Sequence, residues 1–188
     1  KTYNKLIMSI LFFYLFMITM QGYETQPYQV IDTIEAIEIR YYPSVKLVQT
    51  ESLSEENQNF SRLFRYISGA NNTNQKIAMT TPVHMKSENK SQKMAFVLPA
   101  SFNENPPKPV SDQVKIISSK AGYFAAIRYG GYSNVEKVKY FTDKLQKTLN
   151  TINIESLGIP TLLGYNAPYK FYNRRNEIII EITYTQSK

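Results

Sequence analysis

The sequence contains no cysteine and no tryptophan, and its only histidine is His84. Without cysteine the chain cannot form a disulfide, a thiolate metal site or a cysteine nucleophile. A single imidazole also excludes a metal site built from several histidines. No GxSxG elbow is present, and the carboxylates Glu177 and Glu181 have the pattern of solvated or strand-edge charges. We therefore expect that the protein is not an enzyme.

The sequence also lacks blocks of charge of one sign. Its 22 lysines and arginines exceed its 15 acidic residues and give a net charge of +7, but the lysines are dispersed along the chain. Dispersed lysine is typical of a solvated surface, so we expect no nucleic-acid partner. A modest positive excess agrees better with a small anionic ligand. With 188 residues, 43% hydrophobic and 20% charged, the composition is that of one globular domain.

The N-terminal residues 1–22 have the pattern of a targeting segment. Lys1 and Lys5 precede an uncharged apolar run over residues 6–20. A run of about fifteen residues matches the apolar region of a signal peptide and is shorter than the roughly twenty residues that span a bilayer. We predict a signal peptide, with an uncleaved membrane anchor as the alternative. Residues 23–188 would then form a single domain that is secreted or lies in the ER or endomembrane lumen, and that contacts a membrane only through an uncleaved leader.

Three N-x-S/T sequons begin at Asn59, Asn71 and Asn89. Asn71 and Asn89 lie in polar, turn-like stretches where a glycan is tolerated, whereas Asn59 falls inside a predicted helix. The sequons agree with secretion, although such short patterns are common by chance.

The central predicted element is an amphipathic helix that ends just before Gly69, where a helix-terminating glycine belongs. Its apolar residues follow the i, i+3, i+4, i+7 spacing of one stripe, which predicts that they face the core. Arg62, Arg65 and Tyr66 lie off this stripe. The predicted stripe consists of Phe60, Leu63, Phe64 and Ile67.

The pattern around this helix occurs twice. Strands are predicted on both sides of it, and again on both sides of a second amphipathic helix over about residues 134–149. Ile39-Arg40-Tyr41 and Ile127-Arg128-Tyr129 share residues at equivalent places in the two halves of the pattern. The repetition predicts an α+β domain in which duplicated βα units form a distorted antiparallel β-barrel flanked by two α-helices.

Several short blocks of sequence, in order over about residues 23–185, together carry a resemblance to one family. The blocks are Tyr28-Gln29-Val30-Ile31, Glu38-Ile39-Arg40-Tyr41-Tyr42-Pro43, Leu63-Phe64-Arg65-Tyr66-Ile67-Ser68-Gly69-Ala70-Asn71, Lys76-Ile77-Ala78-Met79-Thr80-Thr81-Pro82-Val83, Phe96-Val97-Leu98-Pro99, and Gly164-Tyr165-Asn166-Ala167-Pro168 with Asn173-Arg174-Arg175-Asn176-Glu177. They resemble the SOUL/heme-binding protein family. The resemblance implies non-covalent binding of heme or another tetrapyrrole in a shallow apolar groove beside the first helix.

The resemblance also implies which residues form that groove. In the family, apolar residues of the first helix and a neighbouring loop line it, and basic residues meet the propionates. The matching residues here are Phe60, Leu63, Phe64 and Arg65 on the helix and Lys170 in the loop. A flat macrocycle requires such an apolar platform, and its carboxylates require arginine or lysine at the rim. Phe60 departs from relatives that carry a more pliable side chain such as methionine, and its rigid ring would partly fill the groove.

His84 is the only imidazole available as an axial iron ligand. It precedes Met85 in a predicted strand, so the two side chains should face opposite sides of a sheet. The competing interpretation of His84 is an ordinary half-exposed strand residue. The family implies reversible capture of heme or porphyrin, for transport or buffering, by a monomer. The alternative is a protein-interaction module of the same fold, for which heme binding is weak or incidental.

Overall fold

The computed structural model of the protein describes residues 22–53 and 58–185. The predicted signal peptide or anchor, apart from its last residue, lies outside these ranges. Among the described residues, no helix is long and apolar enough to cross a bilayer.

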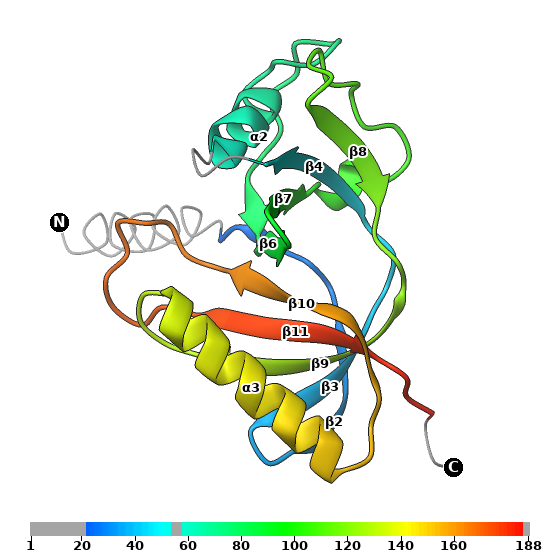
Figure 1. Cartoon of the computed structure of the whole chain (residues 1–188). Coiled ribbons are helices and arrows are strands. Elements are labelled where there is room, and N and C mark those ends of the chain that lie inside the picture. Colours follow the sequence, from blue (N-terminus) through cyan, green and yellow to red (C-terminus); the bar gives the residue numbers. More distant parts are fainter. Residues whose placement is uncertain (1–21, 54–57, 186–188) are drawn as a thin grey trace, which may run out of the picture.

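One antiparallel sheet of nine strands forms most of the structure (Figure 1). Two helices, α2 (Asn59–Ile67) and α3 (Val135–Thr151), pack against it, and the short 3-10 helix η1 (Ala100–Phe102) follows β7. A separate parallel pair joins β1 (Glu24–Thr25) to β5 (Thr80–Thr81). In spatial order the sheet consists of β2 (Gln29–Ile34), β3 (Ile37–Tyr42), β9 (Gly122–Tyr129), β11 (Asn176–Ile182), β10 (Ser156–Gly164), β6 (Val83–Glu88), β7 (Ser91–Val97), β4 (Lys46–Ser52) and β8 (Val114–Ser118).

The predicted α+β architecture, an antiparallel sheet with two flanking helices, is confirmed. The sheet curves like a barrel but does not close, because β2 and β8 form its two edges. The predicted barrel is therefore an open one.

The two helices divide the sheet into two halves. The α2 half contains β6, β7, β4 and β8, and the α3 half contains β10, β11, β9, β3 and β2. In each half a strand leads into the helix and a hairpin follows, as β4-α2-β6-β7 and as β9-α3-β10-β11. The halves meet where β6 pairs with β10, with Met85 opposite Leu162.

This correspondence differs from the one that the sequence suggested. The similar segments 39–41 and 127–129 lie in β3 and β9, which are neighbours in the α3 half and pair with each other, Ile39 opposite Ala125. Strand β9 corresponds instead to β4, because each leads into a helix. Since β3 precedes α2 in the chain but completes the α3 half, a linear comparison of the two halves of the sequence mispairs the strands.

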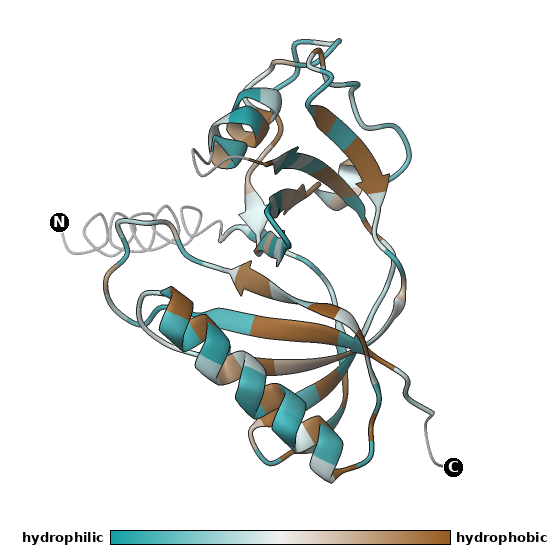
Figure 2. Ribbon diagram, viewed as in Figure 1, coloured by the Kyte–Doolittle hydropathy of each residue, from teal (hydrophilic) through white to brown (hydrophobic). Residues whose placement is uncertain are grey.

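Each helix covers the apolar face of its own half. Leu145 and Leu149 of α3 are buried among isoleucines of β3, β9 and β11. Leu63 of α2 is buried against Val48 of β4 and Phe96 of β7. Figure 2 shows the hydrophobic colour on the strands beneath α3 and the hydrophilic colour along the side of that helix turned away from them. Full burial of such a side chain contributes about 1.5–3 kcal/mol, so these two apolar layers position the helices.

Helix α2 is rotated relative to its predicted stripe. Phe60 and Phe64, both expected in the core, are 44% and 50% exposed. The buried face follows an i, i+4, i+7, i+8 spacing instead. It consists of Asn59, Leu63, Tyr66 and Ile67.

Two polar anchors explain the rotation. The Nδ2 of Asn59 donates to Oγ of Ser52 at 3.2 Å and to the carbonyl oxygen of Gln92 at 2.8 Å. The hydroxyl of Tyr66 donates to the carbonyl oxygen of Pro107 at 2.8 Å. Buried polar groups are stable only when they are hydrogen-bonded, so the helix presents these two residues inward and leaves the phenylalanines at the surface.

The sequon asparagines differ in accessibility. Asn71 is buried, and its Nδ2 donates to the carbonyl oxygens of Tyr66 and Gln75 at 3.2 and 2.7 Å, so the prediction that it tolerates a glycan is wrong. Asn59 is buried as well. Asn89 lies exposed in the turn between β6 and β7, where its φ of +48° is left-handed.

Candidate functional site

The exposed edge of α2 carries an ordered pair of aromatic rings. Phe60 and Phe64 stack with 5.9 Å between their centroids, at an interplanar angle of 13°. Phe60 also packs edge-on against the buried Phe96, at 5.3 Å. The contact with a core residue fixes the position of the pair, while about half of each ring remains in contact with solvent. An exposed, fixed apolar surface of this kind is typical of a recognition site.

Leu63 is not part of this surface. Its side chain is completely buried beneath α2, against the sheet. The residue predicted as part of a ligand platform therefore belongs to the core, and the platform at the surface consists of the two phenylalanines.

Arg65 lies at the exposed end of α2. It borders a hollow of about 180 Å³ whose walls include Arg62, Tyr66 and the connector residues Pro109 and Val110. Within the described part of the chain, no acidic side chain forms an ion pair with Arg65, so its charge is available to an anionic group.

Lys170 lies in the loop 165–175 between β10 and β11, and not among the residues that border the hollow at Arg65. Arg174 gives this loop a fixed shape. Its Nη1 donates to the carbonyl oxygens of Ala167 and Lys170 at 2.8 and 2.5 Å, and its guanidinium lies 4.4 Å from the ring centroid of Tyr132. The Nζ of Lys170 lies 5.8 Å from the ring centroid of the exposed Tyr172, and Lys170 itself is half-buried.

The same loop exposes three aromatic side chains, Tyr169, Phe171 and Tyr172, that the sequence analysis did not single out. The signal was present, because aromatic residues concentrated in a loop have no strand or helix face to bury them. Arg174 bonds the backbone of the same loop at Ala167 and Lys170. The loop is therefore a second exposed apolar surface of the chain.

His84 lies on the opposite face of the sheet from α2. Val83, paired with Phe96, packs in the cluster under α2, and strand alternation places Met85 on the same outer face of the sheet. His84, paired with Ala95, lies on the opposite, inner face. Its Nε2 is hydrogen-bonded to Oε1 of Gln26 at 2.7 Å. Burial lowers the pKa of His84 to about 4, so the imidazole is neutral at physiological pH. The structure thus separates His84 from the phenylalanine pair, and a ligand lying on α2 has no access to it.

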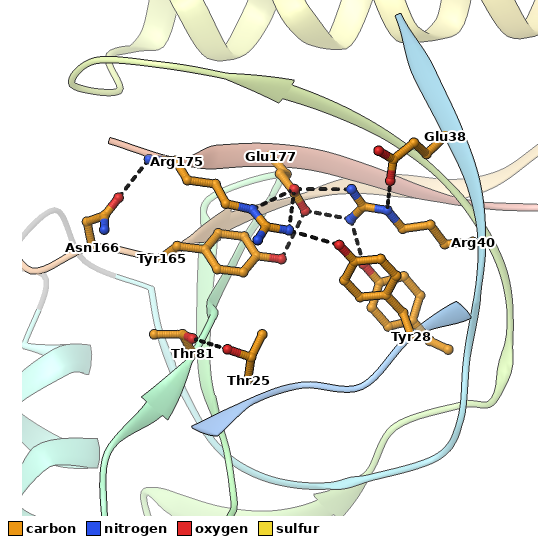
Figure 3. Close-up of polar contacts among 10 residues, drawn as sticks. Thr25, Tyr28, Glu38, Arg40, Thr81, Tyr165, Asn166, Arg175 and Glu177 are labelled. Carbon is orange, nitrogen blue, oxygen red and sulfur yellow. Dashed lines mark hydrogen bonds and ion pairs between the residues drawn. The ribbon is translucent and has the colours of Figure 1, made fainter. Parts of the chain in front are cut away.

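The inner face of the α3 half contains a buried network of charges (Figure 3). Arg40 in β3 donates from Nη1 and Nη2 to Oε2 and Oε1 of Glu177 in β11, at 2.6 and 3.1 Å. The Nε of Arg175 donates to Oε1 of Glu177 at 2.9 Å, and the hydroxyl of Tyr165 donates to Oε2 at 2.9 Å. Glu38 accepts the remaining Nε of Arg40 at 2.7 Å. The positive charges of two arginines are therefore balanced by the negative charges of two glutamates.

Opposing effects set the ionisation of this network. Burial alone would raise the pKa of Glu177, but the hydrogen bonds and charges of Arg40 and Arg175 outweigh it and hold that pKa below its usual range. Burial alone would likewise lower the pKa of Arg40, and Glu177 and Tyr42 reverse the direction. The guanidinium groups of Arg40 and Arg175 and the carboxylate of Glu177 stay charged at neutral pH. They bond to one another and so fix β3, β11 and the loop 165–175.

The interpretation of Glu177 as a solvated or strand-edge charge is therefore wrong, since its side chain is fully buried. Glu181 on the same strand is partly exposed and pairs with Lys120 at 2.5 Å. Within the described residues, no group of three His, Asp or Glu side chains is arranged to hold a metal ion.

The chain matches the family model described as SOUL heme-binding protein over residues 23–181. It is 25% identical to heme-binding protein 1 of Sus scrofa, over 82% of this chain and 90% of that protein. It is 29% identical to heme-binding protein 2 of Homo sapiens, over 75% of each. Among solved structures, the EcmrR C-terminal domain has a TM-score of 0.58 at 11% identity, covering 84% of this chain and 99% of that one. A hydrolase from Listeria innocua has a TM-score of 0.57 at 9% identity, and the match covers 81% of this chain and 94% of that one. The structural matches show a shared fold only.

Proposed function

Because the chain belongs to the SOUL heme-binding protein family, we propose that it binds heme or a related tetrapyrrole reversibly on the exposed edge of α2. The observation that carries the location is the stacked Phe60–Phe64 pair, which is half exposed although it is anchored to the core by Phe96. A flat macrocycle gains by covering such rings, because aromatic surfaces stack face to face with little loss of conformational entropy.

Two basic side chains, Arg65 and Lys170, support an anionic macrocycle. Arg65 follows Phe64 directly on α2, and its guanidinium suits a carboxylate because it donates two parallel hydrogen bonds. Lys170, in the loop 165–175, is proposed as a second cation for the other carboxylate. The tyrosines and phenylalanine of that loop would add apolar surface around the ligand.

In this proposal the protein is a binding protein and makes or breaks no bond in its ligand. Reversible capture would serve transport or buffering of tetrapyrrole. A secreted or lumenal location agrees with the leader-like residues 1–22, and we propose that the protein acts as a monomer. The iron is not assigned to His84, which faces the inner side of the sheet and is occupied by Gln26.

A second candidate function is supported by the loop 165–175. Three exposed aromatic side chains on a hydrogen-bonded loop also suit a protein partner, since aromatic residues dominate the centres of interfaces. On this alternative the same fold is an interaction module and heme is incidental.

Hemin titration distinguishes the two functions. Hemin added to the purified protein should shift its Soret band with saturable binding, at a Kd of about 1 μM or lower. Phe64→Ala should weaken the binding roughly tenfold, which corresponds to about 1.4 kcal/mol of lost stacking. Tyr140→Ala, at a similarly exposed aromatic position on α3, is the matched control and should have no effect. The absence of a Soret shift, together with an unchanged melting temperature, would favour the interaction module.

A further inference from the structure

Beside α3 the structure contains a larger hollow, which we call the α3 groove. It has a volume of about 580 Å³ and lies between the N-terminal half of α3 and strands β6 and β10. Met85, Leu162 and Ile178 form its apolar floor, on three adjacent strands in register. Val138 forms part of its wall, and Lys139 with Asp143 part of its rim.

The groove exists because α3 is fully packed only toward its C-terminal end. Leu145 and Leu149 are buried, whereas Val138 is half-buried and Val135, in the first turn, is 81% exposed. Helix α3 contacts β9, β10 and β11, and α2 contacts β4, β7 and β8. Met85 on β6 lies at the junction between these two covered faces. An apolar strip at the seam of the two halves therefore remains accessible.

The size and lining of the groove suit a small ligand with a large apolar surface. Pockets for small ligands have volumes of about 300–1,000 Å³, so the α3 groove is large enough for a macrocycle and the hollow of about 180 Å³ at Arg65 is not. Another hollow against α3, of about 530 Å³, is lined mainly by charged and hydroxyl side chains such as Lys144, Lys147 and Thr148, and it lacks an apolar floor.

The groove also offers chemistry that suits an iron porphyrin. The thioether of Met85 is a soft donor of the kind that ligates heme iron. A Cβ atom at position 164 would lie 3.1 Å from Cε of Met85, so Gly164 leaves the room that this side chain occupies. Lys139 pairs with Asp143 at 2.8 Å, but both are exposed, and an exposed pair is weak enough for the lysine to exchange its partner for a propionate.

We propose that the α3 groove is a second tetrapyrrole site, in which Met85 lies against the face of the macrocycle and Lys139 meets a carboxylate at the rim. The inference rests on the proposed function, because it assigns the same class of ligand to the second half of the fold. The two sites differ in location and shape. The site on α2 is an exposed pair of rings, whereas the site at α3 is a hollow.

The test follows the methyl resonance of Met85 in protein labelled at its methionine methyl groups. Saturating hemin should broaden this resonance through the unpaired electrons of the iron, and diamagnetic zinc protoporphyrin should shift it without broadening. Assignment is direct, because Met85→Leu removes one resonance of the six methionines. An unchanged Met85 resonance at saturating hemin would overturn the proposal.

Matched variants separate this site from the one on α2. Val138→Glu places a carboxylate in the groove wall and should weaken binding at Met85 at least tenfold, whereas Phe64→Ala should leave the Met85 signal changes intact. If Phe64→Ala abolishes all hemin binding and Met85 never responds, the α2 site stands and the groove site fails. If the unsubstituted protein binds no hemin, both fail. Should Val138→Glu not fold, Val135→Glu, at an exposed position on the same wall, replaces it.

Discussion

The α2 half and the α3 half share one order of strands and helix but expose apolar surface in different ways. Helix α2 has nine residues and is turned by two polar anchors, so its two phenylalanines lie on a convex edge. Helix α3 has seventeen residues, and beside its N-terminal half, where Val135 is exposed and Val138 half-buried, a hollow remains. The length and rotation of each helix therefore decide whether a repeated unit presents a ridge or a groove.

The inner faces of the two halves differ as well. In the α2 half the inner face has an apolar cluster of Val45, Leu47, Ala95 and Val97, with the hydrogen-bonded pair of His84 and Gln26 on the same face. In the α3 half it contains the network around Arg40 and Glu177, together with an apolar cluster around Leu163. Similar backbones can thus be stabilised by hydrophobic packing in one place and by a compensated charge network in another.

The largest effect is expected from breaking that network. Glu177→Ala leaves Arg40 and Arg175 without their central partner, and an uncompensated buried charge destabilises a protein by about 3–5 kcal/mol. Denaturant unfolding measures the change. Glu181→Ala on the same strand removes only a partly exposed pair with Lys120 and should lower the free energy of unfolding by about 1 kcal/mol or less. Equal effects of the two variants would show that burial of Glu177 does not matter.

The next effect tests the rotation of α2. Leu63→Ala should lower the free energy of unfolding by about 2–5 kcal/mol, because it opens a cavity under the helix. Phe64→Ala should lower it by about 1 kcal/mol or less, since half of that ring is already in water. The stripe read from the sequence assigns both residues to the core and predicts large losses for both. Thermal or urea unfolding of the two variants decides between these rotations.

A third prediction concerns the pH dependence of stability at the inner face. The pKa of His84 falls from 6.5 to about 4 on folding, so between these values the unfolded chain binds a proton that the folded chain does not. Stability should therefore decrease as pH falls from 6.5 to 4, by up to about 3 kcal/mol.

His84→Gln should flatten this part of the curve, since the chain has no other histidine. The carboxyl of Glu177, whose pKa is lowered, loses its contribution only at pH values below its ordinary 4.5. A dependence between pH 5 and 6.5 that survives in His84→Gln would contradict the assignment.

The smallest effect separates charge from stacking at α2. Arg65→Glu should weaken hemin binding about three- to tenfold, or roughly 1 kcal/mol, because the exposed side chain meets a propionate across a high-dielectric surface. A porphyrin whose propionates are esterified should bind both proteins equally. Lys144→Glu, the same charge change on α3, is the control. Equal losses for hemin and the ester would argue against a rim role for Arg65.

Much of the fold and of the family could be predicted from local pattern. Strands, two helices and an antiparallel α+β architecture follow from hydrophobic spacing and turn residues. The candidate site was less accessible. Helical spacing alone assigns Phe60 and Phe64 to the core. It does not indicate that Asn59 and Tyr66 face inward instead, because their orientation depends on hydrogen bonds to Gln92 and Pro107, which lie far away in the sequence. The aromatic residues of the loop 165–175 can be recognised in the sequence, because they lie outside any strand or helix that could bury them.

The sequence by itself determined the absence of thiol chemistry, the alternation of strands and helices, and membership of the family, because these depend on composition and on short-range order. Only the tertiary structure decided that Glu177 is buried, that His84 faces away from α2, and that a groove runs along α3. Each depends on which strands become neighbours and how a helix rotates, and those are set by contacts between residues far apart in the chain, such as Arg40 with Glu177 and Met85 with Leu162.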